Sequence, residues 1–218
     1  MGKTIILWNT GGIKTKKIRD EKVNLICDYL EKPQEILFIS LQVTHWTDKT
    51  GYPTELLNHD NLCKFKDAFA YPEDSWSGIT AMINKTHSAP EFHEIIKGRL
   101  IHINIQSIAT REITNIFSYY GYHHNKKYDN NQLEAHINLV NQIIINEKLE
   151  NILYLGDFNY VTEKIDRSNI DSKYDDNNLI VNKWKNFQAS HNLKDTFRYK
   201  YPELRRYTCT TKDKKRKS

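Results

Sequence analysis

The chain has 218 residues, of which 39% are hydrophobic and 27% are charged, values that are typical of a globular domain with a sizeable core. No apolar run reaches the about 18 residues of a membrane span, and Cys27, Cys63 and Cys209 lack metal-binding spacing. We therefore expect an intracellular protein, nuclear or cytoplasmic, with reduced thiols and no membrane partner.

The net charge of +5 comes mostly from the C-terminal end, because residues 1–211 carry 27 basic and 26 acidic side chains. We predict a domain over residues 1–211 and a basic tail over residues 212–218. Lys214, Lys215 and Arg216 in this tail can contact phosphates, although such a run can equally be a solvated end of the chain.

The first third of the chain has the pattern of an α/β protein. Residues 4–9 are apolar and β-branched and stop at a Thr-Gly-Gly loop, and residues 36–41 form a second apolar run that ends at Gln42. Helical spacing over residues 17–31 separates these two predicted strands. Residues 46–71 are polar and irregular, and we predict no element there.

The remaining elements alternate in the same way. We expect strands over residues 77–83, 99–105 and 112–120, the last two forming a hairpin, and a short buried strand over residues 152–155. Apolar residues one turn apart predict helices over residues 131–148 and 178–192. No repeat and no linker interrupts the chain, so one domain is the simplest interpretation.

The strongest local signal for chemistry is the Gly-Asp-Phe-Asn sequence that follows the last predicted strand. Asp157 and Asn159 lie two residues apart and share one side if the extended backbone continues. A carboxylate can hold Mg²⁺ and an amide can hold a phosphate oxygen. The same residue types also form ordinary turns, so this motif alone leaves both interpretations open.

Three other predicted strands also end in characteristic residues, in a fixed order along the chain. The first strand ends in Trp8-Asn9, the second in Gln42, and the strand over residues 112–120 ends in Tyr120-Gly121. With Gly-Asp-Phe-Asn, these ends resemble the endonuclease/exonuclease/phosphatase superfamily. Later residues resemble its retrotransposon (LINE-type) branch, namely Asp166-Arg167, Asp195-Thr196-Phe197-Arg198, Tyr201-Pro202 and Tyr207-Thr208.

The resemblance implies a two-sheet α/β sandwich with outer helices and a Mg²⁺-dependent phosphodiesterase, Mn²⁺ being a possible substitute, that nicks DNA without an obligate protein partner. By position in the motifs, Asn9 frames the metal site, Asp157 orients or activates the attacking water, and Asn159 and Tyr120 hold phosphate oxygens. The resemblance also places Thr44 and His45 at the nucleic-acid-binding edge.

Two departures from the family pattern predict impaired activity. The family's metal-binding glutamate falls at Val43, which offers no oxygen, so we expect weak metal binding. The sequence ends before the family's closing Ser-Asp-His, so we expect the catalytic histidine and the last strand to be missing. Asp48 could replace the glutamate, and His45, His123 or His124 could replace the histidine.

Three alternatives remain open from the sequence. The chain could be a degenerate, non-catalytic copy of the domain that still binds nucleic acid. It could be a phosphoesterase of the same superfamily that acts on small molecules or lipids. It could also be a binding module whose basic tail alone contacts DNA or RNA, in which case binding needs no metal.

Overall fold

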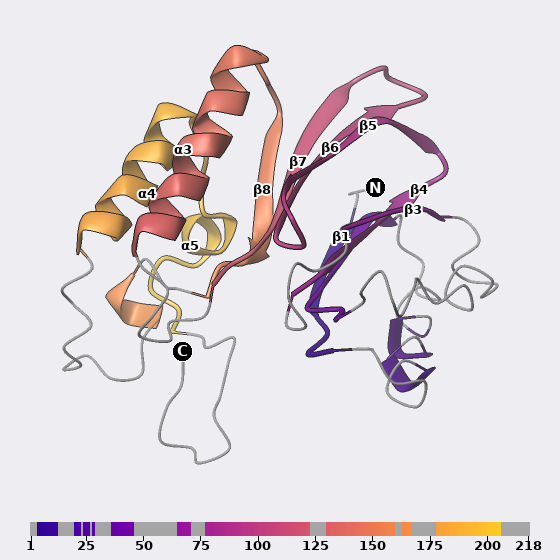
Figure 1. Ribbon diagram of the computed structural model, residues 1–218, viewed down its shortest axis with the longest axis horizontal. Coiled ribbons are helices and arrows are strands. Elements are labelled where there is room, and N and C mark those ends of the chain that lie inside the picture. Colours follow the sequence, from indigo (N-terminus) through magenta and orange to yellow (C-terminus); the bar gives the residue numbers. More distant parts are fainter. Residues whose placement is uncertain are drawn as a thin grey trace. The chain divides into compact units, whose positions relative to one another are not determined.

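Figure 1 shows the computed structural model of the chain. It describes residues 4–12, 20–22, 24–26, 28, 36–45, 65–70, 77–122, 130–159, 163–166 and 178–205. Two compact units make up the chain, and each is treated by itself. The first comprises residues 1–121 and 149–157, and the second comprises residues 122–148 and 158–218.

The first unit contains a four-stranded mixed sheet with the strand order β1-β2-β4-β3. Its strands are β1 (Thr4–Asn9), β2 (Ile36–Gln42), β3 (Phe65–Ala70) and β4 (Ile79–Asn84). β1 and β2 are parallel, whereas β4 runs antiparallel to both of its neighbours. The parallel pair brings the carboxyl ends of β1 and β2 to the same edge.

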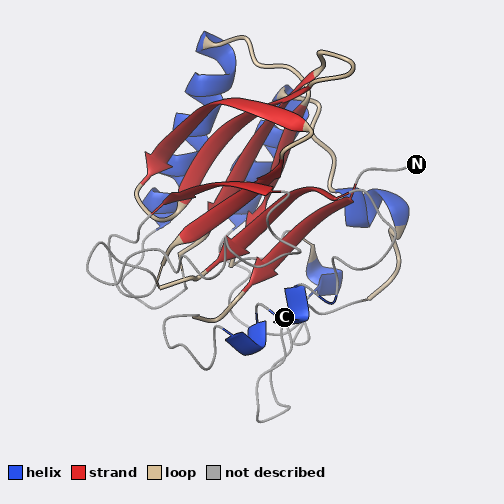
Figure 2. Cartoon of the chain, turned by 90° about the vertical axis from the view of Figure 1, so that its right-hand side faces the viewer, coloured by secondary structure: helices blue, strands red, loops and turns tan. Residues whose placement is uncertain are grey.

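A second mixed sheet in the same unit has the order β5-β6-β7-β8 (strands in red in Figure 2). It consists of β5 (His87–Ile96), β6 (Leu100–Ser107), β7 (Ile113–Tyr120) and β8 (Ile152–Asp157). β5, β6 and β7 form an antiparallel meander, and β8 joins β7 in parallel. The predicted hairpin of β6 and β7 is therefore confirmed.

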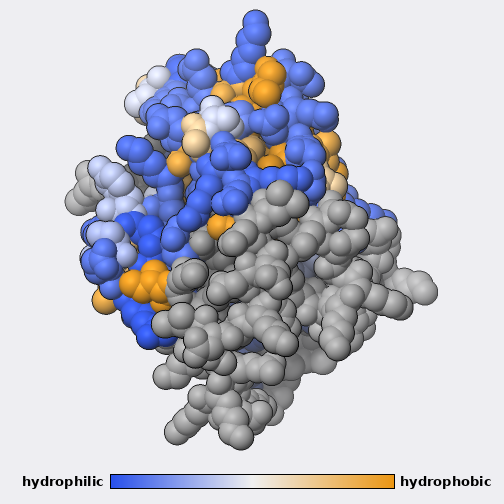
Figure 3. Space-filling view, turned by 90° about the vertical axis from the view of Figure 1, so that its left-hand side faces the viewer, coloured by the Kyte–Doolittle hydropathy of each residue, from blue (hydrophilic) through white to orange (hydrophobic). Residues whose placement is uncertain are grey.

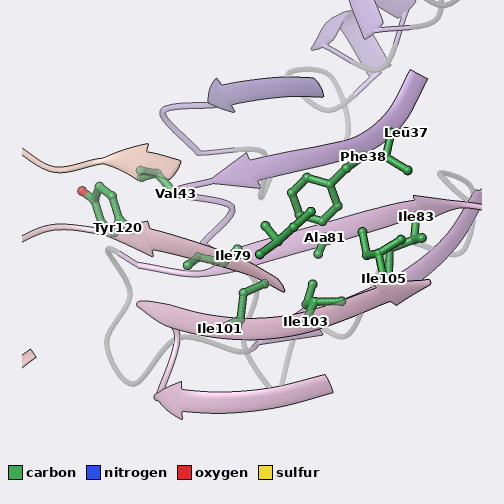
Figure 4. Close-up of a cluster of buried hydrophobic side chains, with 11 residues drawn as sticks. Leu37, Phe38, Val43, Ile79, Ala81, Ile83, Ile101, Ile103, Ile105 and Tyr120 are labelled. Atoms are coloured by element: carbon green, nitrogen blue, oxygen red, sulfur yellow. The ribbon is translucent and has the colours of Figure 1, made fainter. Parts of the chain in front are cut away.

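The core of the first unit lies between the two sheets. Alternate residues point to opposite faces of a strand, and the inward positions of β4 and β6 are almost all isoleucine. Ile79 and Ile83 of β4 share one buried cluster with Ile101 and Ile105 of β6 (Figure 4). Burying several such side chains contributes about 1.5–3 kcal/mol each, so this apolar layer is the main reason that the two sheets associate.

The second unit is helical where it is described. It contains α3 (Asn130–Asn146), the 3₁₀ turn η1 (Lys164–Asp166), α4 (Asn178–Ser190) and α5 (Thr196–Lys200). α3 and α4 pack side by side (Figure 1), and an ion pair between Lys183 and Glu134 links them. The His191 ring nitrogen Nε2 also lies 2.7 Å from Asn141 Oδ1.

His136 is the one residue of α3 whose titration is strongly displaced. Its side chain is 1% exposed, and burial lowers its pKa to about 3 because the charged imidazolium loses its water.

The described surface drawn in Figure 3 is mainly hydrophilic, with small apolar groups scattered over it. Among the helices that the structure describes, none is long and apolar enough to cross a membrane.

The predicted elements agree with the structure at six strands and two long helices. The described residues within the expected helix 17–31 are helical. The sequence did not predict β3, β5 or α5. β5 is an edge strand with polar residues, and its register shifts between Ser88 and Glu91, next to Pro90, which is where sheets tolerate proline.

Candidate functional site

Four strand ends meet in the first unit, two from each sheet. Asn9 and Gln42 are register partners at the ends of β1 and β2. Tyr120 and Asp157 are partners at the ends of β7 and β8. Because both pairs are parallel, each sheet delivers two carboxyl ends to one edge, which is where α/β proteins usually place their ligands.

Gln42 connects the two sheets at this edge. Its Nε2 donates to the carbonyl oxygen of Tyr119 at 2.6 Å, and its Oε1 accepts from the backbone N–H of Asp157 at 2.8 Å. The side chain is completely buried, so both bonds lie away from water. Gln42 therefore fixes the backbone that presents the Asp157 carboxylate.

Asn9 holds that carboxylate directly. Its Nδ2 donates to Asp157 Oδ2 at 2.6 Å, and its Oδ1 accepts from the backbone N–H of Gly11 at 3.0 Å. Because both ends of the amide have a partner, the orientation of the Asn9 side chain is determined. Asn9 is exposed and Asp157 is half-buried, so the pair can meet a ligand from solvent.

Gly156 allows β8 to approach β7 closely enough for this arrangement. A Cβ atom at this position would lie 1.9 Å from the carbonyl oxygen of Tyr119, and φ is +155°. No other residue type fits this space without moving the backbone. The glycine of the Gly-Asp-Phe-Asn sequence is therefore required by strand pairing, independently of any catalytic role.

Val43, at which the sequence resemblance places the family's glutamate, faces the core. Its side chain is 7% exposed and belongs to the buried cluster between the sheets (Figure 4). Its φ of 59° is left-handed, a conformation that β-branched residues rarely adopt. Thr10 Oγ1 donates to the carbonyl oxygens of Gln42 and Val43, both at 2.9 Å, and Gly12 N–H donates to Val43 O at 2.8 Å.

Thr44 and His45 continue from Val43 and pair with the segment before β4. Thr44 N–H donates to Gly78 O at 3.2 Å, and His45 N–H donates to Ser77 O at 3.1 Å. The Thr44 side chain is fully buried, whereas His45 is half-buried. The His45 ring packs so closely on Gly12 that a Cβ there would lie 2.7 Å from its Nδ1. Their predicted contact with nucleic acid stays a prediction.

The other predicted site residues have different environments. Tyr120 is 1% exposed within the core cluster, and the Arg99 guanidinium carbon lies 5.3 Å from its ring centroid. Asn159 belongs to the second unit and has a left-handed φ of 55°. Their phosphate-holding roles stay predictions. The remaining candidates lie outside the described residues, namely Asp48, His123, His124, Lys214, Lys215 and Arg216.

Sequence reasoning gave no role to two residues that shape this edge. Gln42 is part of the motif that carries the resemblance, and that motif was the signal for it. Lys22 Nζ donates to the carbonyl oxygen of Gly12 at 2.9 Å and also to that of Thr10. Burial lowers the pKa of Lys22, and no sequence pattern singled out this lysine.

The described residues do not form a complete Mg²⁺ site. Mg²⁺ needs near-octahedral oxygen ligation, usually including one or two carboxylates. Among the described residues there is no group of three or more His, Cys, Asp or Glu side chains suited to a metal. At the strand ends they supply the Asp157 carboxylate and amide oxygens, while Val43 supplies none.

Comparison with solved structures shows that the two mixed sheets and their helices have the fold of endonuclease/exonuclease/phosphatase proteins. The chain is similar to NExo, a 3′ phosphatase from Neisseria bound to a product DNA hairpin, with TM-score 0.68 and 13% identity over 95% of this chain and 78% of the other. It is similar to the AP endonuclease LMAP from Leishmania major, with TM-score 0.68 and 14% identity over 96% and 73%.

A third similar structure is the endonuclease domain of TRAS1, a telomere-specific non-LTR retrotransposon, with TM-score 0.54 and 7% identity over 85% of this chain and 69% of that domain. No protein-family model matches the sequence, and no curated protein matches it. The likenesses show the fold, so the two-sheet α/β class predicted from the sequence is confirmed.

Proposed function

We propose that this chain is a DNA-directed phosphodiesterase, related to retrotransposon endonucleases, whose hydrolytic step is severely weakened. The observation that carries the proposal is the Asn9–Asp157 pair, bonded at 2.6 Å where four strand ends meet. The names of similar structures favour DNA over a small molecule or lipid, since one of them was solved with a DNA product and another is an AP endonuclease.

The geometry supports a role for Asp157 in handling the attacking water. A carboxylate that accepts a hydrogen bond from Asn9 keeps its second oxygen's lone pairs in a defined direction, which favours orienting a water toward a phosphate. General acid–base assistance of this kind is worth about 10²–10⁴ in rate. Val43 brings no carboxylate to the same edge, so binding of Mg²⁺ or Mn²⁺ is weak in this proposal.

Plasmid nicking in Mg²⁺ or Mn²⁺ tests the proposal. We expect slow nicking by the unmodified chain and loss of that nicking in Asp157→Ala. Removal of an exposed carboxylate elsewhere, in Glu112→Ala, should leave the rate unchanged.

A second candidate function is favoured by the burial of Val43 in the core. In a non-catalytic copy of the domain, a DNA duplex still binds but no variant nicks it. Fluorescence anisotropy with a labelled duplex separates the two, provided that circular dichroism shows each variant to be folded. Nicking that persists at the same rate in Asp157→Ala would refute the catalytic proposal outright.

A further inference from the structure

A short segment of the second unit presents aromatic and basic side chains together. Tyr199 of α5 is 75% exposed and Tyr201, directly after α5, is 42% exposed. Lys194 and Lys200, which lie beside them in the sequence, are also exposed. These four residues are called the tyrosine–lysine surface below.

Each lysine of this surface lies against a tyrosine ring. Lys194 Nζ is 5.0 Å from the centroid of Tyr199, and Lys200 Nζ is 5.4 Å from the centroid of Tyr201. These distances fit cation–π contacts, which hold a long, flexible side chain next to the ring. Each tyrosine ring thus has a positive charge over one of its faces.

Two charged side chains of the same segment, Asp195 and Arg198, hold the backbone beneath this surface. Asp195 caps α5 by accepting from the N–H groups of Phe197 and Arg198 at 2.9 and 3.0 Å. Arg198 forms an ion pair with Asp166 and donates to the carbonyl oxygens of Pro202 and Leu204 at 3.2 and 3.0 Å. The segment therefore has a defined shape before any ligand arrives.

Electrostatics at the surface favour an anionic ligand. Among the exposed charged residues between 194 and 205, Lys194, Lys200 and Arg205 are positive and Asp195 and Glu203 are negative, so positive charge is in slight excess. Positive charge next to exposed aromatic rings is the combination by which proteins bind unpaired nucleotides, with bases stacked on rings and phosphates near lysines.

We propose that the tyrosine–lysine surface binds single-stranded DNA. The inference rests on the proposed function for the choice of DNA as the polymer. None of its residues belongs to the Asn9–Asp157 edge. A single strand fits better than a duplex because its base faces are open to stacking. Bases stack on Tyr199 and Tyr201, and Lys194 and Lys200 neutralise the adjoining phosphates.

Fluorescence anisotropy with a labelled thymidine oligonucleotide tests this surface in the full chain. Tyr199→Ala should raise the Kd by about fivefold to 150-fold, the effect of losing one base–aromatic stack. Tyr199→Phe keeps the ring and should bind normally. The matched control is Ile145→Ala, which removes another side chain of the same unit, 59% exposed, and should have no effect.

Salt dependence and cross-linking measure contact with the nucleic acid, and neither would change if these residues only stabilised the fold. Lys200→Ala should reduce the slope of log K against log salt by about 0.7, the value for one phosphate of a single strand. Lys97→Ala, at an exposed turn of the first unit, should leave the slope unchanged. Irradiation of a 5-iodouracil oligonucleotide should cross-link to the peptide that contains Tyr199 and Tyr201.

The outcomes separate this proposal from the proposed function. Equal affinities of Tyr199→Ala and Ile145→Ala would overturn it, as would tighter binding of the matching uridine RNA. If the chain binds or nicks duplex DNA but does not bind single-stranded DNA, the proposal for the tyrosine–lysine surface is wrong and the proposed function stands. Binding that depends on Tyr199 in a chain that never nicks DNA would support the surface and refute the catalytic proposal.

Discussion

Replacing Gln42 with leucine should strongly destabilise the first unit. Leucine has nearly the same volume, so the core stays filled, but the hydrogen bonds of 2.6 Å to Tyr119 O and 2.8 Å to Asp157 N are lost. The site is fully buried, so water cannot readily replace them. Losing two buried bonds of this kind costs about 2–5 kcal/mol.

Urea denaturation followed by circular dichroism measures the effect. The matched control is Ser40→Ala, because Ser40 is equally buried and also joins the two sheets, through a bond of 2.7 Å to Ser118 Oγ. That variant should lose only about 1 kcal/mol. If Gln42→Leu and Ser40→Ala unfold at the same urea concentration, the bridging role given to Gln42 is wrong.

Two further predictions concern stability. Gly156→Ala should unfold the first unit or lower its free energy of unfolding by at least about 4 kcal/mol, because the new Cβ would lie 1.9 Å from Tyr119 O. The control Gly11→Ala, whose Cβ would have nothing within 4 Å, should lose only about 1 kcal/mol because of its left-handed φ. Equal melting temperatures of the two variants would contradict this prediction. His136 has a folded pKa of about 3, below its ordinary 6.5, so the unfolded state binds more protons between these values. The contribution of His136 to stability should therefore be constant above pH 6.5 and fall toward pH 3, by up to about 1.4 kcal/mol per pH unit, and the pH dependence of His136→Leu should be flatter.

Six of the eight described strands were predictable because their sequences are unambiguous. Runs such as residues 36–41 and 152–155 are apolar and β-branched and stop at glycine or polar residues, and the structure has strands there. β5 has a proline and five polar residues among its ten, because an edge strand with one exposed face needs little apolar surface. Its sequence therefore contains no signal that distinguishes it from a loop.

The site was predictable only in part. Motif order along the chain indicated which strand ends belong together, and Asn9, Gln42 and Asp157 are indeed brought to one edge by hydrogen bonds. Sheet order and register decide which strand ends meet. They depend on contacts between residues far apart in the chain and therefore leave no trace in local sequence patterns. The burial of Tyr120 in the core also results from sheet order and register, so the residues next to it in the sequence do not indicate it.

The bond network around Gln42 and Gly156 has a consequence for how sequences of this kind are interpreted. Gly156 is demanded by the approach of β8 to Tyr119, and Gln42 by the seam between the sheets. The first unit therefore needs both residues in order to fold, whether or not the chain hydrolyses DNA. A glycine at position 156 and a glutamine at position 42 are thus markers of the architecture and do not by themselves indicate activity.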